Sequence, residues 1–347
     1  MQYLVYDQSG KKQMLLQNVT SIQWNPKYWE SGTAEIHARP TTENVQYLVE
    51  HNRVVCQDRN EIMFIDYVQR SDQNDDGDDM IIHGYLDNLD ARINTNTLAI
   101  TDAEQGLRKL VTNNKRGLDI NLAEEAGLGV KVTRTETTWE TLRSTFETIC
   151  QTAGLGWREV MKDGQLNTIE IYQGKTREGA RFSDNLGNIV DQELTKNLDG
   201  YGNYLYVLGE ETDTGRTQVI LDKRIDGEPT LEAYIDARDL QSTYTDDSGE
   251  EQTYTDDEYK ALLTARGESK YADMLNSAYS FTCIIQENNE LNQLGTDYDL
   301  GDLVPIISKR FGVLNLARIT GIKFVEEQNT QTQTSLELTI EKQEILK

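Results

Sequence analysis

Two regions of this chain share one order of patterns: a short β-rich run, a turn, a longer run, a hydrophilic loop and a third run. The runs cover residues 54–55, 62–68 and 80–84 in the first region, and residues 303–306, 316–322 and 336–340 in the second. Runs of this kind, bounded by turns, are typical of antiparallel strands. Sequence identity between the regions is negligible, so the match is one of pattern. It predicts two similar β domains separated by a region of different character.

Residues 1–98 are predicted to form the first small antiparallel β-barrel, because about six short strands follow one another closely. Apolar residues at near-helical spacing predict one short helix over residues 41–49. In the loop of residues 72–79, Asp72, Asn74, Asp76 and Gly77 match positions 1, 3, 5 and 6 of a calcium-binding EF-hand loop. Position twelve would be His83 rather than a glutamate, and strands rather than helices flank the loop. A solvated hairpin tip is therefore favoured over a calcium site.

Residues 99–190 are predicted to form an α+β domain, because the period of the pattern becomes helical. Residues 103–111 predict one helix. A second is expected to begin at Thr137, where Thr137 and Glu140 have capping-box spacing, and to end at Gly154. Two runs joined at residues 162–164 predict a hairpin against which the helix packs. Trp139 and Trp157 are both expected in the core rather than on a ligand-binding surface.

Residues 191–347 are predicted to form the second β-barrel domain, with an insertion at about 228–278. Between Arg238 and Lys260 there are many acidic residues and no Lys or Arg. This predicts a solvated acidic loop or hairpin, followed by a helix that starts near Thr255.

The second barrel is expected to begin at a turn around residues 298–302. Gly301 can adopt the positive φ that such a turn often requires, and Asp302 can bond nearby backbone N–H groups. Pro305 lacks an N–H donor, which indicates an edge strand or a strand start. Arg318 lies in the longer run that follows.

The net charge of −25, from 59 acidic and 34 basic residues, argues against binding to the nucleic-acid backbone or to anionic membranes. It equally fits a protein that is merely very soluble. Cys56, Cys150 and Cys283 lie far apart, which predicts buried thiols rather than a disulfide framework. The first residues lack the basic and apolar regions of a signal peptide, and no apolar run is long enough to span a membrane.

Catalytic and ligand-binding motifs are not found. The three histidines, His37, His51 and His83, do not occur at the spacing of a metal site, and His37 and His83 are expected to be structural residues on strands. The chain has no nucleophile elbow, phosphate-binding loop or dinucleotide-binding glycine motif. With 59 acidic residues, no single carboxylate pair can be assigned to glycoside hydrolysis. We therefore predict no catalytic, cofactor-binding or metal-binding residues.

Seven segments carry a family resemblance: residues 24–36, 83–86, 154–157, 171–175, 202–207, 298–304 and 317–319. In their order and spacing the chain resembles the N-terminal structural region of siphophage and prophage tail-hub proteins, the family of prophage tail endopeptidases and tail-associated lysins. Gly301, Asp302 and Arg318 fall in the last two segments and are the residues we assign to the family motif. Their implied role is structural.

The resemblance implies a phage baseplate-hub-like fold, in which two small β-barrels and inserted α+β domains make up each subunit of a trimer. Such a ring of six barrels docks on the tail-tube or distal tail protein, carries a tip fibre or lysin component, and surrounds the DNA channel. An acidic lumen would let DNA pass without specific binding. The expected location is the virion tail, after synthesis in the cytoplasm of the host bacterium, with no membrane partner.

Two other functions stay open: a cell-wall-degrading tail hydrolase and a carbohydrate-binding module for host attachment. The chain stops at Lys347, without the long extension that carries the hydrolase in many relatives, so we expect no lytic activity. A phage, a prophage remnant and a phage-tail-like bacteriocin fit the pattern equally well.

Overall fold

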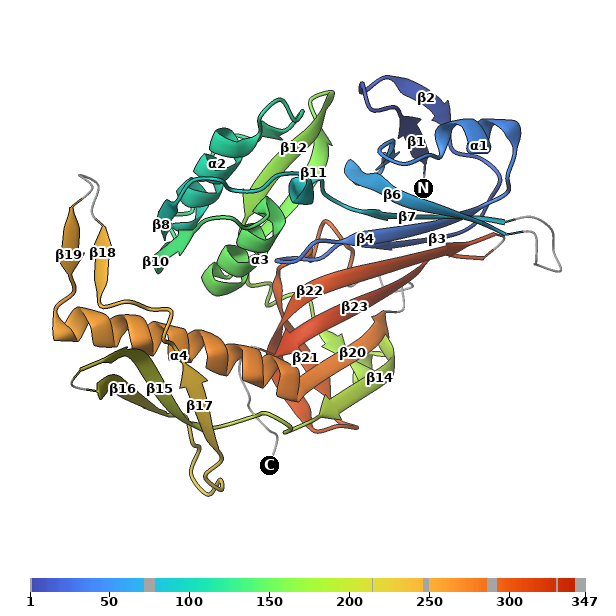
Figure 1. The fold of residues 1–347 in the computed structure, drawn as a ribbon. Coiled ribbons are helices and arrows are strands. Elements are labelled where there is room, and N and C mark those ends of the chain that lie inside the picture. The colour runs from blue at the N-terminus through green and yellow to red at the C-terminus, as the bar shows by residue number, and fades with distance from the viewer. Residues whose placement is uncertain are drawn as a thin grey trace. The chain divides into compact units, whose positions relative to one another are not determined.

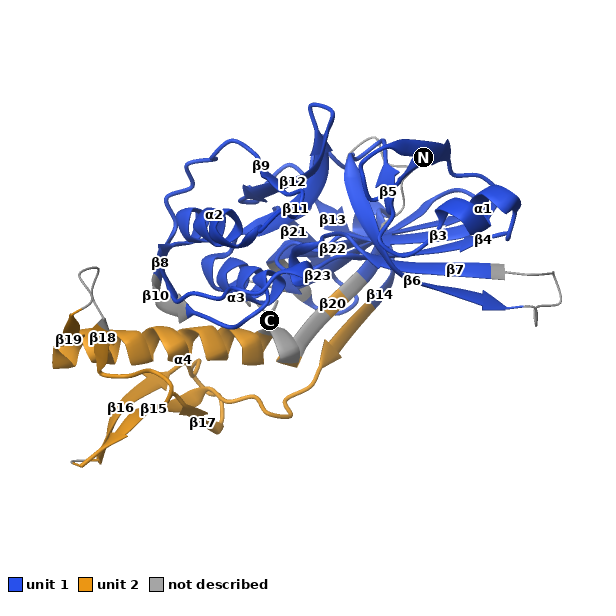
Figure 2. Ribbon diagram, turned by 45° about the horizontal axis from the view of Figure 1, so that its top comes forward, with its two compact units in different colours: residues 1–192, 282–347 blue, residues 193–281 orange. Residues whose placement is uncertain are grey.

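The computed structural model describes residues 2–71, 79–213, 215–245, 250–285, 292–328 and 330–340. It divides into two compact units: unit 1, of residues 1–192 and 282–347, and unit 2, of residues 193–281 (Figure 2). Strands predominate among the described residues (Figure 1), which confirms the predicted mixed, mainly β, multi-domain class. The finer division at residues 98 and 190 stays a prediction, because compactness alone does not separate smaller domains within unit 1.

The N-terminal part of unit 1 is built from strands and one short helix, namely β1 (Tyr3–Tyr6), β2 (Lys12–Leu15), β3 (Val19–Asn25), β4 (Thr33–Ala38), α1 (Thr42–Tyr47), β5 (Arg53–Cys56), β6 (Glu61–Ser71) and β7 (Asp79–Tyr85). Helix α1 begins after Thr41, whose side chain accepts a hydrogen bond from the Asn44 N–H, so the predicted short helix is confirmed. Residues 72–78, which include most of the loop tested as a calcium site, lie outside the described residues.

Both predicted strand triplets exist, and each is an antiparallel meander. The first triplet is β5, β6 and β7, and the second is β21 (Leu303–Ser308), β22 (Val313–Glu327) and β23 (Gln333–Ile340). Pro305 is the third residue of β21. Strand β13 (Phe182–Ser183) pairs with β21 only from Ile306 onward, so the missing N–H of Pro305 lies near the strand start.

The two triplets also share an irregularity in the middle of the long strand. The register shifts between Ile65 and Tyr67 in β6, and between Ile319 and Gly321 in β22. These positions correspond in the pattern that relates residues 62–68 to residues 316–322. One extra residue at the same place in both strands bends and twists them alike.

The turns that lead into the triplets match as well. His51 has φ 68° and donates its N–H to the Ile65 carbonyl at 2.9 Å, while Gly301 has φ 90° and donates its N–H to the Ile319 carbonyl at 2.8 Å. The backbone repeat thus extends beyond the strands that the sequence pattern marked.

Strand β3 joins the two triplets into one sheet. Its Trp24 pairs with Phe324 of β22 on one side, and β4 followed by β7 continues the sheet on the other. The order β23-β22-β3-β4-β7-β6 can be followed in Figure 1. Trp24 is completely buried, so the joining strand also supplies a large core side chain.

The α+β part of unit 1 comprises η1 (Leu89–Ala91), β8 (Leu98–Asp102), α2 (Ala103–Asn114), β9 (Asn121–Leu122), β10 (Lys131–Thr137), α3 (Leu142–Ala153), β11 (Gly156–Lys162) and β12 (Gln165–Tyr172). One apolar core holds α2 and α3 against the β11–β12 hairpin, with Phe146 edge-on to Trp157 at 5.4 Å between ring centroids. The predicted hairpin, and the predicted core position of Trp157, are confirmed.

Two expectations for the segment before α3 are wrong. Thr137 ends strand β10, and α3 begins at Leu142 with Thr141 as its N-cap. Trp139 is 73% exposed rather than in the core. The Thr137 hydroxyl does bond the Glu140 carboxylate at 3.2 Å, so the capping-box residues meet, but within a loop. Helix α3 ends as predicted at Gly154, with φ 64°.

Unit 2 is a three-stranded sheet covered by a long helix on one face. Its elements are β15 (Tyr204–Thr212), β16 (Gly215–Asp222), β17 (Glu232–Asp236), β18 (Thr243–Thr245), β19 (Glu251–Thr253) and α4 (Asp256–Ala278). Leu205, Val207 and Leu263 form its core. The helix predicted near Thr255 is confirmed, and Thr255 and Glu258 form the capping box there. The chain changes from unit 1 to unit 2 within β14 (Ile189–Lys196) and returns to unit 1 within β20 (Tyr279–Ile285). The short helix η2 (Asp184–Leu186) precedes β14.

Candidate functional site

A buried tyrosine, Tyr28, is the centre of a junction in unit 1. It follows β3 and has no exposed surface. Its hydroxyl donates to the Gly154 carbonyl at 3.0 Å and accepts from the Gly174 N–H at 2.9 Å. The ring packs edge-on against Tyr172, with 5.5 Å between centroids. One side chain thereby ties the end of α3 to the segment after β12.

Three glycines let the backbone approach this ring. A Cβ atom at Gly156 or at Gly301 would lie 2.2 Å from the Tyr28 ring, and a Cβ at Gly174 would lie 1.7 Å from the Gly301 carbonyl oxygen. Real Cβ atoms do not tolerate such distances, and buried protein interiors have little free space into which neighbours could move. The junction therefore requires glycine at all three positions.

Asp302 fixes the next segment by accepting hydrogen bonds from three N–H groups. Its side chain is almost fully buried. Oδ1 accepts from the Lys175 backbone N–H at 2.6 Å, and Oδ2 accepts from Arg177 Nε at 2.8 Å and from the Asp299 backbone N–H at 3.0 Å. A buried carboxylate needs such partners, because an unpaired buried charge is strongly destabilising.

Arg318 completes the junction from strand β22. It is buried, its Nη1 donates to the Gly301 carbonyl at 2.8 Å, and its guanidinium carbon lies 5.5 Å from the centroid of the Tyr28 ring. Gly301, Asp302 and Arg318, the three residues singled out in the sequence, therefore lie together. Their role as a family motif stays a prediction.

Sequence reasoning missed Tyr28, Gly156, Gly174 and Arg177. The first three lie within segments that carry the family resemblance, which was the available signal. Nothing local shows that they meet, because the contacts join positions more than a hundred residues apart.

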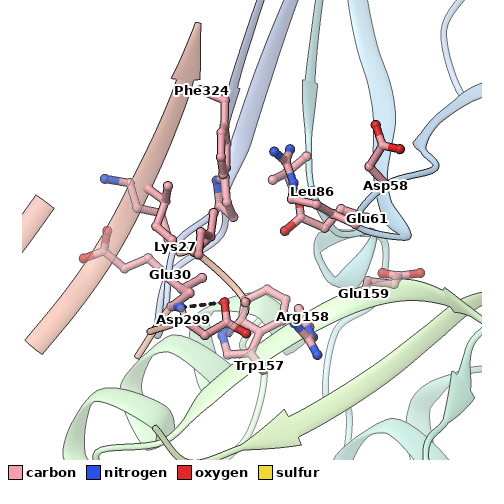
Figure 3. A pocket seen from close by; sticks show the side chains of 17 residues that line it. Lys27, Glu30, Asp58, Glu61, Leu86, Trp157, Arg158, Glu159, Asp299 and Phe324 are labelled. Carbon is pink, nitrogen blue, oxygen red and sulfur yellow. Dashed lines mark hydrogen bonds and ion pairs between the residues drawn. The ribbon is translucent and has the colours of Figure 1, made fainter. Parts of the chain in front are cut away.

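A cavity of about 320 Å³ lies beside this junction in unit 1 (Figure 3). Its apolar lining includes Leu86, Trp157, Leu300, Ile322 and Phe324, and charged side chains surround these. The volume is at the lower end of that of small-molecule sites.

One side of the cavity carries an ion pair held between aromatic rings. Arg59 Nε donates to Glu61 Oε2 at 2.9 Å, and the Trp24 indole N–H donates to the same oxygen at 2.6 Å. The Arg59 guanidinium carbon lies 3.8 Å from the centroid of the Phe324 ring. This packing favours a fixed structural pair over a mobile catalytic one.

Glu159 also contributes to the lining, and burial raises the pKa of its carboxyl group to about 8. The residue is 1% exposed, and Oε2 accepts from the Asn88 N–H at 2.9 Å. A protonated carboxyl group near neutral pH can act as a general acid, but little of this residue is exposed, and Oε2 is already held by the Asn88 N–H. No cluster of metal-ligating side chains occurs among the described residues.

His37 and His83 lie on strands β4 and β7, as predicted. Glu35 lies between them, with Oε1 2.9 Å from His37 Nε2 and Oε2 3.3 Å from His83 Nδ1. Tyr67 stacks on His83 with 4.3 Å between ring centroids. These contacts account for both rings as parts of the sheet surface.

The chain belongs to the family described as Siphovirus ReqiPepy6 Gp37-like protein, which matches residues 3–340. The predicted kinship with phage tail proteins is thus confirmed. A location in the virion tail follows. Within the described parts of the chain, no helix is long and apolar enough to cross a membrane.

Solved structures share the fold at low sequence identity. The prophage MuSo2 43 kDa tail protein from Shewanella oneidensis aligns with a TM-score of 0.66 at 13% identity, over 98% of each chain. The tail protein from Neisseria meningitidis MC58 aligns with a TM-score of 0.62 at 13% identity, over 98% of this chain and 97% of that one. Prophage tail protein gp18 from Listeria monocytogenes EGD-e aligns with a TM-score of 0.55 at 13% identity, over 99% and 96%. No curated protein sequence matches significantly.

Proposed function

We propose that this protein is a structural hub at the tip or baseplate of a phage tail, in which three copies form a ring around the DNA path. The repeated strand triplet carries the proposal. Two similar triplets in each of three copies give six similar elements, which suits docking on a hexameric tail tube. The partners would be the tail-tube or distal tail protein on one side and a tip fibre or lysin component on the other.

The charge supports a passive channel. With a net charge of −25, the protein repels the phosphate backbone, so DNA would slide through the ring without specific contacts.

We propose no catalytic role. The buried position of Glu159 and the fixed pair of Arg59 and Glu61 support this view. A cell-wall zymogram checks it directly: clearing by the purified chain would instead favour the hydrolase alternative. Binding of cell-wall saccharides by the isolated chain would favour the host-attachment alternative.

Light scattering tests the ring. We expect the protein to form a trimer with three times the subunit mass of 39.6 kDa. The trimer forms either in the protein alone or once tail-tube protein is added, in which case the complex is heavier. Electron micrographs should show a three-lobed ring with a hole of at least about 20 Å, the width that duplex DNA requires. A strict monomer at every concentration, with no binding to tail-tube protein, would refute the proposal.

A further inference from the structure

Trp139 is an exposed tryptophan in an unusual backbone conformation. Its side chain is 73% exposed, and its φ is 59°. Bulky residues rarely adopt positive φ, and such strain persists only where surrounding structure imposes it. The capping and core roles expected from the sequence do not explain it.

A buried polar network holds this conformation. The Trp139 N–H donates to the Asn94 carbonyl at 2.7 Å, and the Asn94 N–H donates to the Glu140 carbonyl at 2.8 Å. The Asn94 side chain, itself buried, donates to the Thr137 carbonyl at 2.9 Å and accepts from Asn114 Nδ2 at 3.1 Å. Fully bonded buried networks are rigid, so the indole ring is carried on a fixed support.

Cations surround the neighbouring exposed residue Ile93. Arg116 Nη2 donates to the Ile93 carbonyl at 2.8 Å, and Arg92 Nε donates to the Lys115 carbonyl at 3.1 Å. In the part of the chain that the structure describes, no ion pair joins Arg92, Lys115 or Arg116 to a carboxylate. Cations are favourable at the C-terminus of α2, but that role does not require an exposed Trp139 and Ile93 beside them.

We infer that this surface, the tryptophan patch of Arg92, Ile93, Lys115, Arg116 and Trp139, docks on an acidic surface of a second copy of the protein. The Trp139 backbone is bonded to the segment that carries Arg92 and Ile93, and exposed tryptophan and arginine side chains are typical of residues that dominate binding energy. The charge argues for the occupant, because the patch is locally basic whereas the whole chain carries −25.

The same charge determines the kind of contact. Two tryptophan patches do not face each other across a twofold axis, because like charges would oppose one another. The patch contacts a different surface of its neighbour, and such head-to-tail contacts form a ring when the rotation from one copy to the next closes. This inference rests on the proposed ring and names the residues that close it.

Two variants test the patch. Trp139→Gly removes the indole and suits the positive φ, so the monomer should melt no lower than the wild type while self-association weakens at least about tenfold. Arg116→Glu reverses one charge and should also weaken self-association. The weakening should be larger at low salt than at high salt, because salt screens exposed charges. Sedimentation across a concentration series measures both, and melting is compared at concentrations below assembly.

Matched controls are Tyr234→Ala, which removes another exposed aromatic side chain, and Lys109→Glu, which reverses an exposed charge on helix α2, whose end precedes Arg116. Neither should alter assembly. A wild-type ring together with unchanged rings in Trp139→Gly and Arg116→Glu would overturn the inference and leave the hub standing. Loss of duplex-DNA binding in Arg116→Glu, with assembly unchanged, would also overturn it. A wild type that forms no ring would refute the proposed function instead.

Discussion

The turns before the two strand triplets have the same backbone shape but different residues at the decisive position. His51 and Gly301 both have positive φ and bond matching isoleucines. His51 is exposed, whereas Gly301 packs against the ring of Tyr28. The difference shows that a positive φ alone does not require glycine at this turn. Glycine is required at position 301 because the ring of Tyr28 approaches the backbone closely there.

The next residue repeats this contrast between local and distant contacts. The carbonyls of Asn52 and Asp302 accept from the N–H groups of Ile65 and Ile319, both at 2.9 Å. The Asn52 side chain donates to the nearby Tyr47 carbonyl at 2.9 Å, whereas the Asp302 carboxylate binds the segment after β12. The turn before the first triplet is thus held by the neighbouring helix α1, and the turn before the second by the distant segments of the junction.

Each triplet has one buried arginine in a pair formed by its first two strands. The two pairs occupy corresponding positions, but the arginine lies on the first strand in one triplet and on the second strand in the other. Arg53 of β5 faces Phe64, while Arg318 of β22 faces Leu303. Phe64 and Arg318 each lie one residue before the isoleucine at which the register of the long strand shifts. The duplicated backbone keeps its geometry while the polar side chain changes strand.

The largest effect is expected from Gly301→Ala. One Cβ atom would lie 2.2 Å from the Tyr28 ring, so unfolding free energy should fall by about 4 kcal/mol or more. Urea denaturation measures it. Gly312→Ala is the control, since Gly312 has φ 67° with no atom near a Cβ, and backbone strain alone costs about 1 kcal/mol. Equal losses in both variants would contradict the role of Tyr28.

Asp302→Asn should cost about 2 to 3 kcal/mol, because it removes the buried charge that binds Arg177 and leaves two part-buried backbone N–H groups, those of Lys175 and Asp299, with a poorer acceptor. Asp299→Asn, in the same turn with an exposed side chain, should change little. Thermal unfolding of both variants decides the point, and similar melting temperatures would refute it.

Glu159→Gln should remove a pH dependence of stability associated with the first triplet, whose β6 pairs with the β11 strand that carries Glu159. Burial raises the folded-state pKa to about 8, above the unfolded value of 4.5. Between those pH values only the unfolded chain ionises, so the wild type loses up to about 1.4 kcal/mol per pH unit. Above pH 8 the loss stays constant.

Denaturation of wild type and Glu159→Gln from pH 5 to 8 should therefore show a growing advantage of the variant. Glu170→Gln is the opposite control: burial raises the pKa of Glu170, but contacts with Lys162 and Arg158 lower it overall. Because the folded-state pKa of Glu170 is lowered, its contribution to the stability of the wild type is lost as pH falls. Parallel pH profiles for wild type and Glu159→Gln would show that Glu159 is not the titrating group.

The smallest effect is expected from His51→Gly. Relief of the positive φ in an exposed turn should raise stability by about 0.5 kcal/mol, after the entropy of glycine in the unfolded chain is subtracted. Glu50→Gly, one position earlier and outside the residues with positive φ, should lower stability. Loss of stability in His51→Gly would mean that its side chain has a role beyond the turn.

The strand triplets could be predicted from sequence because alternation encodes strands even where identity is lost. Local signals also gave the end of α3 at Gly154 and the capping box at Thr255. They failed at Thr137, where the capping-box spacing was present but the buried Asn94 side chain bonds the Thr137 carbonyl and holds the backbone in another path. Tertiary contacts decided that boundary.

The junction was only partly accessible from sequence. Gly301, Asp302 and Arg318 carried recognisable patterns, but their partners Tyr28 and Gly174 are distant in sequence. Close approach of a ring to a glycine leaves no periodic signal, because it depends on where three separate segments cross.

The pairing of Trp24 with Phe324 has a consequence for how the protein is made. Strand β3 leaves the ribosome long before its partner β22, yet chains fold from the N-terminus as they emerge. Until β22 has emerged, the side of β3 away from β4 is an open strand edge, the kind of surface at which nascent chains join one another. Covering that edge, by a chaperone or by rapid synthesis of the segment up to β22, is therefore expected to favour production of this tail protein in soluble form.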